Sequence, residues 1–299
     1  STIGNIINNG DINGSTTGIG ANSGNGIFSY SDSVSTIGNI INNGDINGST
    51  TGSGYNSGNG IYSYSKPSST IGDITNSGSI SGNSTGGNSS GNGISSYSEP
   101  SNTIGNITNS GIISGSSIDV GELGNGIYLY SNSGSSIIES ISNSGTITSA
   151  IGDGIFSTSS GGKSTIKLFS NSGVIMGKNN GIYIYGDSNS GINDYNNYGL
   201  VIGQTPVLVD KDGSGTNTFS DPAGQGMAIT LENDGSIKTN GITSGTGGKA
   251  GIYSIINTTL QNGGVDAYNE YTNDENISNS IINGAGVNSG TVTIEADKN

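Results

Sequence analysis

The residue types best suited to hold a cation lie in the polar segment 210–221. Positions 1, 3, 5, 7 and 12 of this segment are Asp210, Asp212, Ser214, Thr216 and Asp221. An EF-hand-like loop supplies oxygen ligands for Ca²⁺ from these positions, and the glycine that it needs at position 6 is Gly215. We predict a Ca²⁺ site here, in a protein that requires no other cofactor. The alternative is a plain hairpin excursion, because Asp-Gly-Ser-Gly is also an ordinary turn.

Aromatic side chains form a second pattern, at alternate positions after a repeated Gly-Ile pair. Alternate side chains of a strand share one face, so we predict an outward-facing ladder of rings along successive repeats. The residues proposed for this face are Phe28, Tyr30, Tyr62, Tyr64, Tyr97, Tyr128, Tyr130, Tyr183 and Tyr185. A tyrosine face combines apolar rings with polar hydroxyl groups. Such a face suits the stacking of sugar rings or the docking of another rod-shaped protein. The alternative is that inserted segments such as 15–23 cover this face, or that the rings only stabilise one another.

The composition excludes several classes of chemistry. The chain has no Cys and no His, so Ser-His-Asp and Cys-His catalysis and the usual zinc sites are excluded. All basic residues are Lys, and with a formal charge of −14 the chain lacks the basic surface that nucleic acid requires. No apolar run is long enough for a membrane-spanning helix, so we expect no direct membrane insertion.

The acidic residues show no paired-carboxylate motif for acid–base catalysis. Asp11 and Asp45 recur at equivalent positions, as do Asn5, Asn39 and Asp73. A polysaccharide-cleaving site would need clustered carboxylates and, for acidic sugars, Arg or Lys to bind the substrate charge. These rows of side-chain oxygen atoms fit a solvated acidic face better than a polysaccharide-cleaving site, and we expect no enzymatic activity.

An internal repeat determines the architecture. Residues 1–18 and 35–52 are identical, and an Asn-x-Gly element followed by Ile or Val recurs every 26–36 residues. Each unit holds three short strand-like runs separated by Asn, Gly and Ser. One unit alone cannot bury the apolar side chains of these runs, whereas a stack of units can. We predict an all-β fold, a right-handed parallel β-helix (solenoid) of about nine to ten coils. Residues 1–191 are expected to form regular coils, and 192–299 a less regular continuation with longer loops.

Aligning the repeats places the apolar residues in four columns that face a narrow core. In the first repeat these columns begin at Ile3, Ile6, Ile12 and Ile27. Ile favours strands, and its regular stacking explains how a chain with only 29% hydrophobic residues can build a core. The Asn of each Asn-x-Gly element falls at a sharp turn between two strands, where we predict that stacked amides bond one another along the axis.

A family resemblance rests on two kinds of unit: Asn-Ser-Gly-x-Ile at 109–113 and 143–147, and Gly-Ile-Tyr at 126–128 and 181–183. These units resemble the repeats of bacterial autotransporter passenger domains, which are type V secreted, β-helical surface proteins. The resemblance covers most of 1–191 closely and 192–299 loosely. It implies a parallel β-helix displayed at a cell surface, often with adhesion or self-association.

Together these observations predict an extracellular, non-enzymatic protein of the bacterial cell surface that acts as an adhesin or cell–cell association rod. The expected partners are other copies of the chain, or glycans and proteins of host or bacterial surfaces. The alternative is a structural subunit that stacks end to end into a filament or surface layer. That alternative arises because the end coils of a β-helix expose unpaired strand edges, which template pairing.

Overall fold

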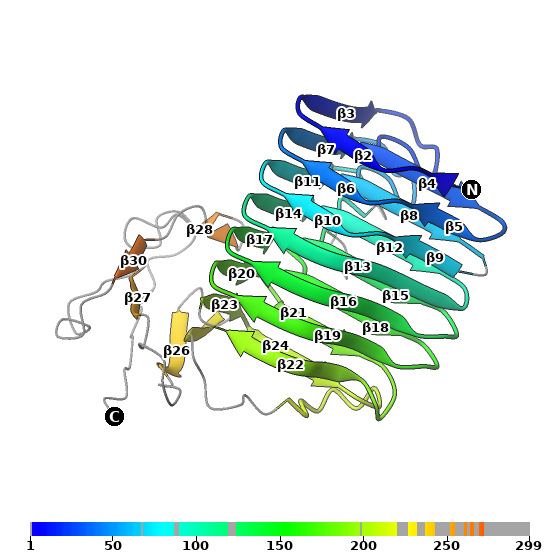
Figure 1. The fold of residues 1–299 in the computed structure, drawn as a ribbon. Helices are drawn as coiled ribbons and strands as arrows, with labels where there is room; N and C mark the ends of the chain where they lie inside the picture. The colour runs from blue at the N-terminus through cyan, green and yellow to red at the C-terminus, as the bar shows by residue number, and fades with distance from the viewer. Residues whose placement is uncertain are drawn as a thin grey trace.

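The computed structural model describes residues 2–66, 68–86, 90–118, 124–197 and 199–219 in full, together with six further strands between Met227 and Tyr271. Throughout these residues the regular structure consists of strands and turns, arranged as a stack of coils (Figure 1). The predicted parallel β-helix is therefore confirmed. No helix in the described part of the chain has the length and apolar character needed to cross a membrane.

Three parallel sheets form the walls of the solenoid. The first contains β1 (Thr2–Ile3), β2 (Ile6–Asn8), β5 (Ser35–Ile37), β6 (Ile40–Asn42), β9 (Ser68–Ile71), β10 (Ile74–Asn76), β13 (Ser101–Asn109), β16 (Ser136–Asn143), β19 (Ser164–Asn171) and β22 (Gly191–Asn197). The second contains β3 (Asp11–Thr16), β7 (Asp45–Thr50), β11 (Ser79–Ser84), β14 (Ile112–Ser117), β17 (Thr146–Ser149), β20 (Val174–Met176), β23 (Leu200–Gly203), β25 (Met227–Leu231) and β26 (Ile237–Ile242). The third contains β4 (Ile27–Ser31), β8 (Ile61–Ser65), β12 (Ile94–Ser98), β15 (Ile127–Ser131), β18 (Ile155–Ser159), β21 (Asn180–Tyr185) and β24 (Thr205–Asp210).

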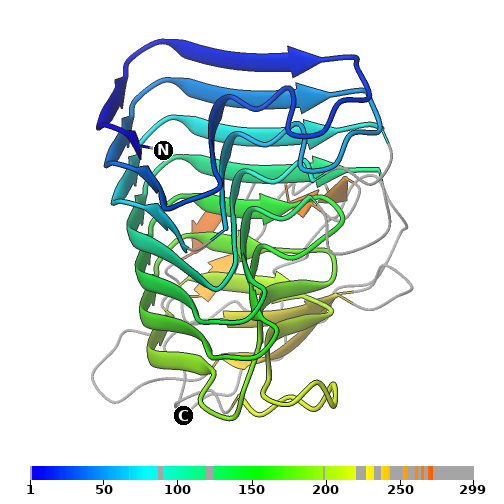
Figure 2. The ribbon, with the colours of Figure 1, turned by 90° about the vertical axis from the view of Figure 1, so that its right-hand side faces the viewer.

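Each coil passes through the first, second and third sheets in turn and then begins the next coil. The chain visits the third sheet seven times up to Asp210, so the described residues complete seven coils, stacked from the N-terminal end downward in Figure 2. β25 continues the second sheet in parallel, but β26 pairs with β25 in the antiparallel sense. The predicted number of nine to ten coils is not confirmed, and the division at residue 191 stays a prediction.

Beyond β26, two antiparallel pairs are described. β27 (Ile252–Ser254) pairs with β30 (Asn269–Tyr271), and β28 (Leu260–Gln261) pairs with β29 (Gly264–Val265). A coil of the solenoid pairs its strands in parallel with the coil before it. These short antiparallel pairs therefore differ from the seven coils in the way their strands are joined.

The strand register confirms the four predicted apolar columns over the seven coils but not beyond them. Leu231, which the repeat alignment assigns to the second column on the first sheet, lies on β25 of the second sheet, and Ile237, assigned to the third column, pairs with Leu231 in the antiparallel sense. The first column runs Ile3, Ile37, Ile71, Ile104, Ile138, Ile166 and Ile192, and the second runs Ile6, Ile40, Ile74, Ile107, Ile141, Phe169 and Tyr195. The third ends at Val201 and the fourth at Val207. Almost all the members inside the stack are fully buried. Burial of one Ile side chain contributes about 1.5–3 kcal/mol, so the columns stabilise a chain with few apolar residues.

The interior also holds polar side chains that the apolar columns did not predict. Pairs of serine hydroxyls bond inside the coil where the third sheet leads into the first, namely Ser29 with Ser35, Ser63 with Ser69, and Ser164 with Ser157, each at 2.7 Å. Such pairs satisfy both hydroxyls without water, so a narrow core accepts them at low cost. At equivalent places in other coils the chain has Leu129 and Ile184, which are buried as well.

The predicted asparagine ladder is confirmed as well. Seven asparagines bond in series from Nδ2 to the next Oδ1 at 2.7–2.8 Å: Asn8, Asn42, Asn76, Asn109, Asn143, Asn171 and Asn197. Asn233 and Asn262, which the same repeat pattern predicts to follow, lie outside the described residues. The ladder lies between the first and second sheets, where it fixes the turn in every coil.

Candidate functional site

The third sheet carries a continuous stack of tyrosine rings on its outer face. Tyr30, Tyr64, Tyr97 and Tyr130 follow one another in four successive coils, one from each of β4, β8, β12 and β15. Their ring centroids are separated by 5.1, 5.1 and 4.8 Å, and adjacent ring planes differ by 5°, 18° and 21°. We call these four residues the tyrosine ladder. Strand spacing sets the distance between rings, because parallel strands place equivalent side chains directly above one another.

The tyrosine ladder remains accessible to solvent. Tyr30 is 44% exposed, and the other three rings are partly exposed. Three of the hydroxyls reach acceptors in the following turn: Tyr30 donates to Asp32 at 3.1 Å, Tyr97 to Glu99 at 3.4 Å and Tyr130 to Asn132 at 3.3 Å. The sequence pattern did not reveal these pairs, in which the acceptor lies two residues after the tyrosine; two residues after Tyr64 the chain has Lys66, whose side chain is not an acceptor. The ladder thus presents ring surface beside a row of hydrogen-bond acceptors.

The hydroxyls of Tyr30 and Tyr97 stay protonated at neutral pH. Burial raises the pKa of Tyr97 to about 12, and the neighbouring Tyr130 and Glu99 add to this rise. The hydrogen bond to Asp32, followed by the charge of that carboxylate, raises the pKa of Tyr30. Both tyrosines are therefore neutral hydrogen-bond donors over the physiological range.

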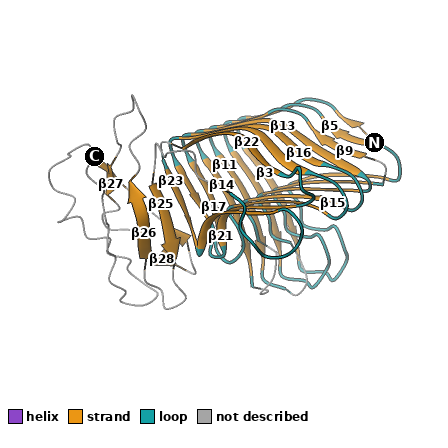
Figure 3. Ribbon diagram, turned by 90° about the horizontal axis from the view of Figure 1, so that it is seen from below, coloured by secondary structure: helices purple, strands orange, loops and turns teal. Residues whose placement is uncertain are grey.

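A second column of aromatic residues lies two residues earlier in the same strands, and its burial varies from Phe28, which is 38% exposed, to Tyr62, which is 0% exposed. It contains Phe28, Tyr62, Tyr128, Phe156 and Tyr183, with Ser95 between Tyr62 and Tyr128. Phe28 stacks on Tyr62 at 5.5 Å, and Phe156 stacks on Tyr183 at 4.8 Å. Tyr62 and Phe156 are essentially inaccessible. The loops that follow the second sheet project on the side of β15 and β21 (Figure 3).

The burial of Tyr62 corrects the expectation that all the outward aromatic residues form one open face. Its hydroxyl is buried without a hydrogen-bond partner, and burial raises its pKa well above the usual value. Strand alternation fixes the direction of a side chain, but it does not say whether a loop covers it. Tyr128, Tyr183 and Tyr185 are partly exposed, and Tyr185 is separated from Tyr130 by Thr158.

The predicted calcium loop forms a tight turn closed by its own carboxylates. Asp210 is buried at the end of β24, where its Oδ1 accepts the Gly213 N–H at 2.9 Å and its Oδ2 accepts the Gly215 N–H at 3.1 Å. Both glycines have φ near +75°, a conformation that favours glycine. Asp212 accepts the N–H of Ser214 at 3.0 Å, and hydrogen bonds from Ser214 lower the pKa of Asp212.

The remaining members of the proposed ligand set add little to this geometry. The Thr216 N–H donates to Ser214 Oγ at 3.2 Å, and Asp221 lies outside the described residues. Within the described ranges, no group of three or more His, Cys, Asp or Glu side chains is placed to hold a metal ion. The Ca²⁺ site stays a prediction, and the hairpin alternative remains open with it.

Calorimetric titration with Ca²⁺ tests the predicted site. We expect heat of binding and a higher melting temperature for the wild type, because a ligand that binds only the folded state stabilises it. The double variant Asp210→Ala/Asp212→Ala should show neither effect, whereas Asp45→Ala, which removes an exposed carboxylate elsewhere, should behave as the wild type. A wild type that shows no heat, no change in melting temperature and no change in proteolysis of the loop would establish a plain hairpin.

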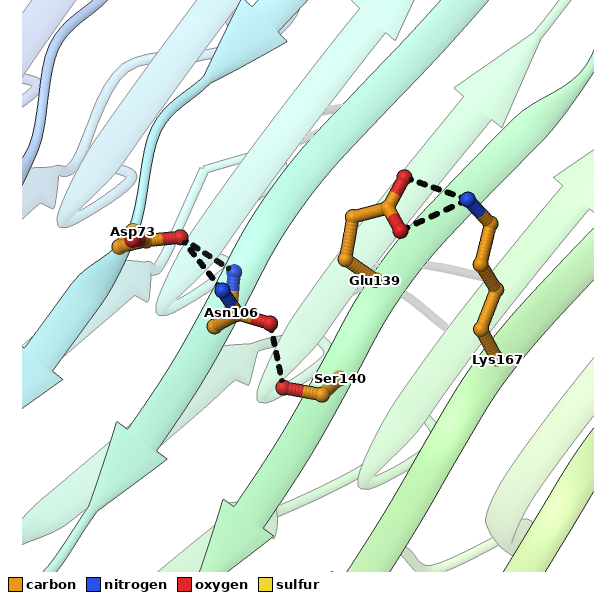
Figure 4. Close-up of polar contacts among 5 residues, drawn as sticks. All are labelled: Asp73, Asn106, Glu139, Ser140 and Lys167. Carbon is orange, nitrogen blue, oxygen red and sulfur yellow. Dashed lines mark hydrogen bonds and ion pairs between the residues drawn. The ribbon is translucent and has the colours of Figure 1, made fainter.

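The outer face of the first sheet carries an axial file of polar side chains, shown in Figure 4. Asp73 Oδ1 accepts the Asn106 backbone N–H at 2.8 Å and the Asn106 amide at 3.0 Å, and Ser140 donates to Asn106 Oδ1 at 2.7 Å. Beside this file, Lys167 forms an ion pair with Glu139 at 2.7 Å. These groups are exposed, so each contact adds little stability. The file fits the predicted solvated polar face.

Comparison with known proteins assigns the chain to no family. No family model matches the chain, and neither a curated protein nor a solved structure shows significant similarity to it. The functional argument therefore depends on the sequence and on the arrangement of its own side chains.

Proposed function

We propose that this protein is an extracellular rod of the bacterial cell surface that acts as an adhesin and recognises glycans through the tyrosine ladder. The observation that carries the proposal is the stack of four partly exposed rings at 4.8–5.1 Å along the solenoid axis. Apolar ring faces stack on the C–H faces of sugars, and the adjacent acceptors can bind sugar hydroxyls. The resemblance to autotransporter passenger repeats also supports this proposal, because those proteins are displayed at the cell surface.

The chemistry of the exposed surface supports binding rather than catalysis. The chain lacks His and Cys, and its carboxylates on the first and second sheets lie in hydrogen-bonded or solvated files. A repetitive rigid wall with a long axial stack of rings can contact several units of a polymer at once. Multiple weak contacts of this kind raise the overall affinity without any single deep pocket.

The test is a glycan array followed by affinity measurement on the best ligand. We expect Tyr64→Ser/Tyr97→Ser/Tyr130→Ser to weaken binding by about 1,000-fold, since each of the three rings contributes roughly tenfold. The corresponding Phe triple variant should keep most of the affinity if the ring faces carry the contact. Tyr55→Ser is the matched control, because Tyr55 is 60% exposed but belongs to a loop outside the ladder.

Circular dichroism and melting curves of the same variants separate binding from packing. Unchanged binding together with a large fall in melting temperature would give the ladder a purely stabilising role and contradict the proposal. Absence of any glycan ligand, with clumping of cells that display the rod, would instead favour contact between copies of the protein.

A second candidate function is end-to-end assembly into a filament or surface layer. Two observations favour it. Residues 1–18 and 35–52 are identical in sequence, and the strands of the second coil pair in parallel with those of the first coil on their N-terminal side. A coil of this sequence can therefore pair with an identical coil on its N-terminal side, which is the kind of contact that end-to-end assembly requires. Filaments in electron micrographs of the pure protein would favour this function, and a monomer at high concentration would oppose it.

A further inference from the structure

The outer face of the second sheet changes from polar to apolar along the solenoid. Two columns of side chains point outward on this sheet, on either side of the inward column that ends at Val201. The first reads Asp11, Asp45, Ser79, Ile112, Thr146, Val174 and Leu200, and the second reads Asn13, Asn47, Ser81, Ser114, Thr148, Met176 and Ile202. The last two coils thus place four large apolar side chains on a face that is polar in the first three coils.

These four side chains are buried although they point away from the core. Val174 is 1% exposed, and Met176, Leu200 and Ile202 are 0% exposed. None of the four belongs to the core cluster, which includes their inward neighbours Ile175 and Val201. One coil earlier, Thr146 and Thr148 are only partly buried. Neighbouring coils alone therefore leave this face partly open, and full burial requires a cover over β20 and β23.

The part of the chain placed to supply this cover is the C-terminal segment. β26 reverses direction on β25 at the lower end of the second sheet, which leads the chain away from the coil path. β29 contacts β17, the strand of the second sheet one coil above β20. Figure 1 shows β28, its pairing partner, on the same side of the solenoid as β17. A chain that continued as coils would extend the stack and could not reach back to β17.

We infer that Val174, Met176, Leu200 and Ile202 form a docking face for the C-terminal strand pair β28 and β29 of the same chain. This strand pair lies against the outside of the second sheet instead of extending the solenoid. Burial of four large apolar side chains drives the docking, because each contributes transfer free energy when it leaves water. The tyrosine ladder lies on a different sheet, so docking leaves it free to bind. The inference does not depend on the proposed glycan-binding function.

Thiol accessibility tests the docking face in the intact protein. The chain has no Cys, so a single introduced cysteine reports on one position. We expect Met176→Cys to react with a thiol reagent about 100-fold more slowly than Asn47→Cys, since a covered site reacts only after local opening. Asn47 is the matched control because it occupies the same outward column in the second coil. Equal reaction rates at the two positions would overturn the inference.

A cysteine pair tests the identity of the cover. Thr148→Cys combined with Val265→Cys should form an intramolecular disulfide under mild oxidation, whereas Asn47→Cys combined with Val265→Cys should not. Slow labelling of Met176→Cys should persist on dilution, because the covering segment belongs to the same chain. Protection that disappears on dilution, or a disulfide found only between two chains, would show that a second copy covers the face and would contradict the assignment.

Discussion

We expect Asn109→Ala to lower the free energy of unfolding by about 2–4 kcal/mol, because it breaks the buried asparagine ladder in the middle of the stack. Asn109 is 0% exposed. Its Nδ2 donates to Asn143 Oδ1 at 2.8 Å, to Thr146 O at 3.1 Å and to Gly111 O at 3.2 Å. Its Oδ1 accepts from Asn76 at 2.8 Å. Alanine removes all four bonds and leaves the Asn143 oxygen without its donor in a dry interior.

Asn106→Ala is the matched control, measured by the same denaturant titration. Asn106 lies in the same strand, β13, and also bonds along the axis to Asp73 and Ser140, but it is exposed to water. Water replaces the bonds lost there, so we expect a change below about 1 kcal/mol. Similar losses for the two variants would mean that burial does not give the inner ladder its strength.

The second large effect is expected from Gly44→Ala, which should destabilise the protein by about 3 kcal/mol. A Cβ at Gly44 would lie 2.0 Å from the Gly10 carbonyl oxygen in the coil above. That oxygen accepts the Asp45 N–H at 2.9 Å, so the two coils cannot separate without losing a bond of the sheet. The three nearest atoms all belong to the Gly10 backbone, so no side-chain rotation relieves the clash.

Gly10→Ala provides the control within an identical stretch of sequence. A Cβ at Gly10 meets no atom within 4 Å, and the backbone there is not in the left-handed region. We expect a change within about 0.5 kcal/mol, with slight stabilisation from the reduced freedom of the unfolded chain. Thermal and chemical unfolding of both variants measure the difference. Equal effects at Gly10 and Gly44 would contradict the stacking of the first coil on the second.

The repeat in the sequence was sufficient to predict the parallel β-helix, the four apolar columns and the asparagine ladder. Each of these features depends on equivalent residues meeting their copies one coil away. Such contacts follow from the repeat register alone, because parallel strands align identical positions. Ile3 pairs with Ile37, and Asn8 with Asn42, as the alignment required. The direction of the tyrosine side chains followed in the same way from strand alternation.

The tertiary structure alone decided which of the outward positions are covered. Tyr62 and Tyr64 are two residues apart on one strand and face the same side, yet Tyr62 is buried and Tyr64 is partly exposed. Gly10 and Gly44 have identical neighbours in the sequence, yet only Gly44 lies beneath another coil. Met176 continues a polar column and is nevertheless fully buried. Periodicity fixes the direction of a side chain, whereas its burial depends on segments distant in sequence that the period does not describe.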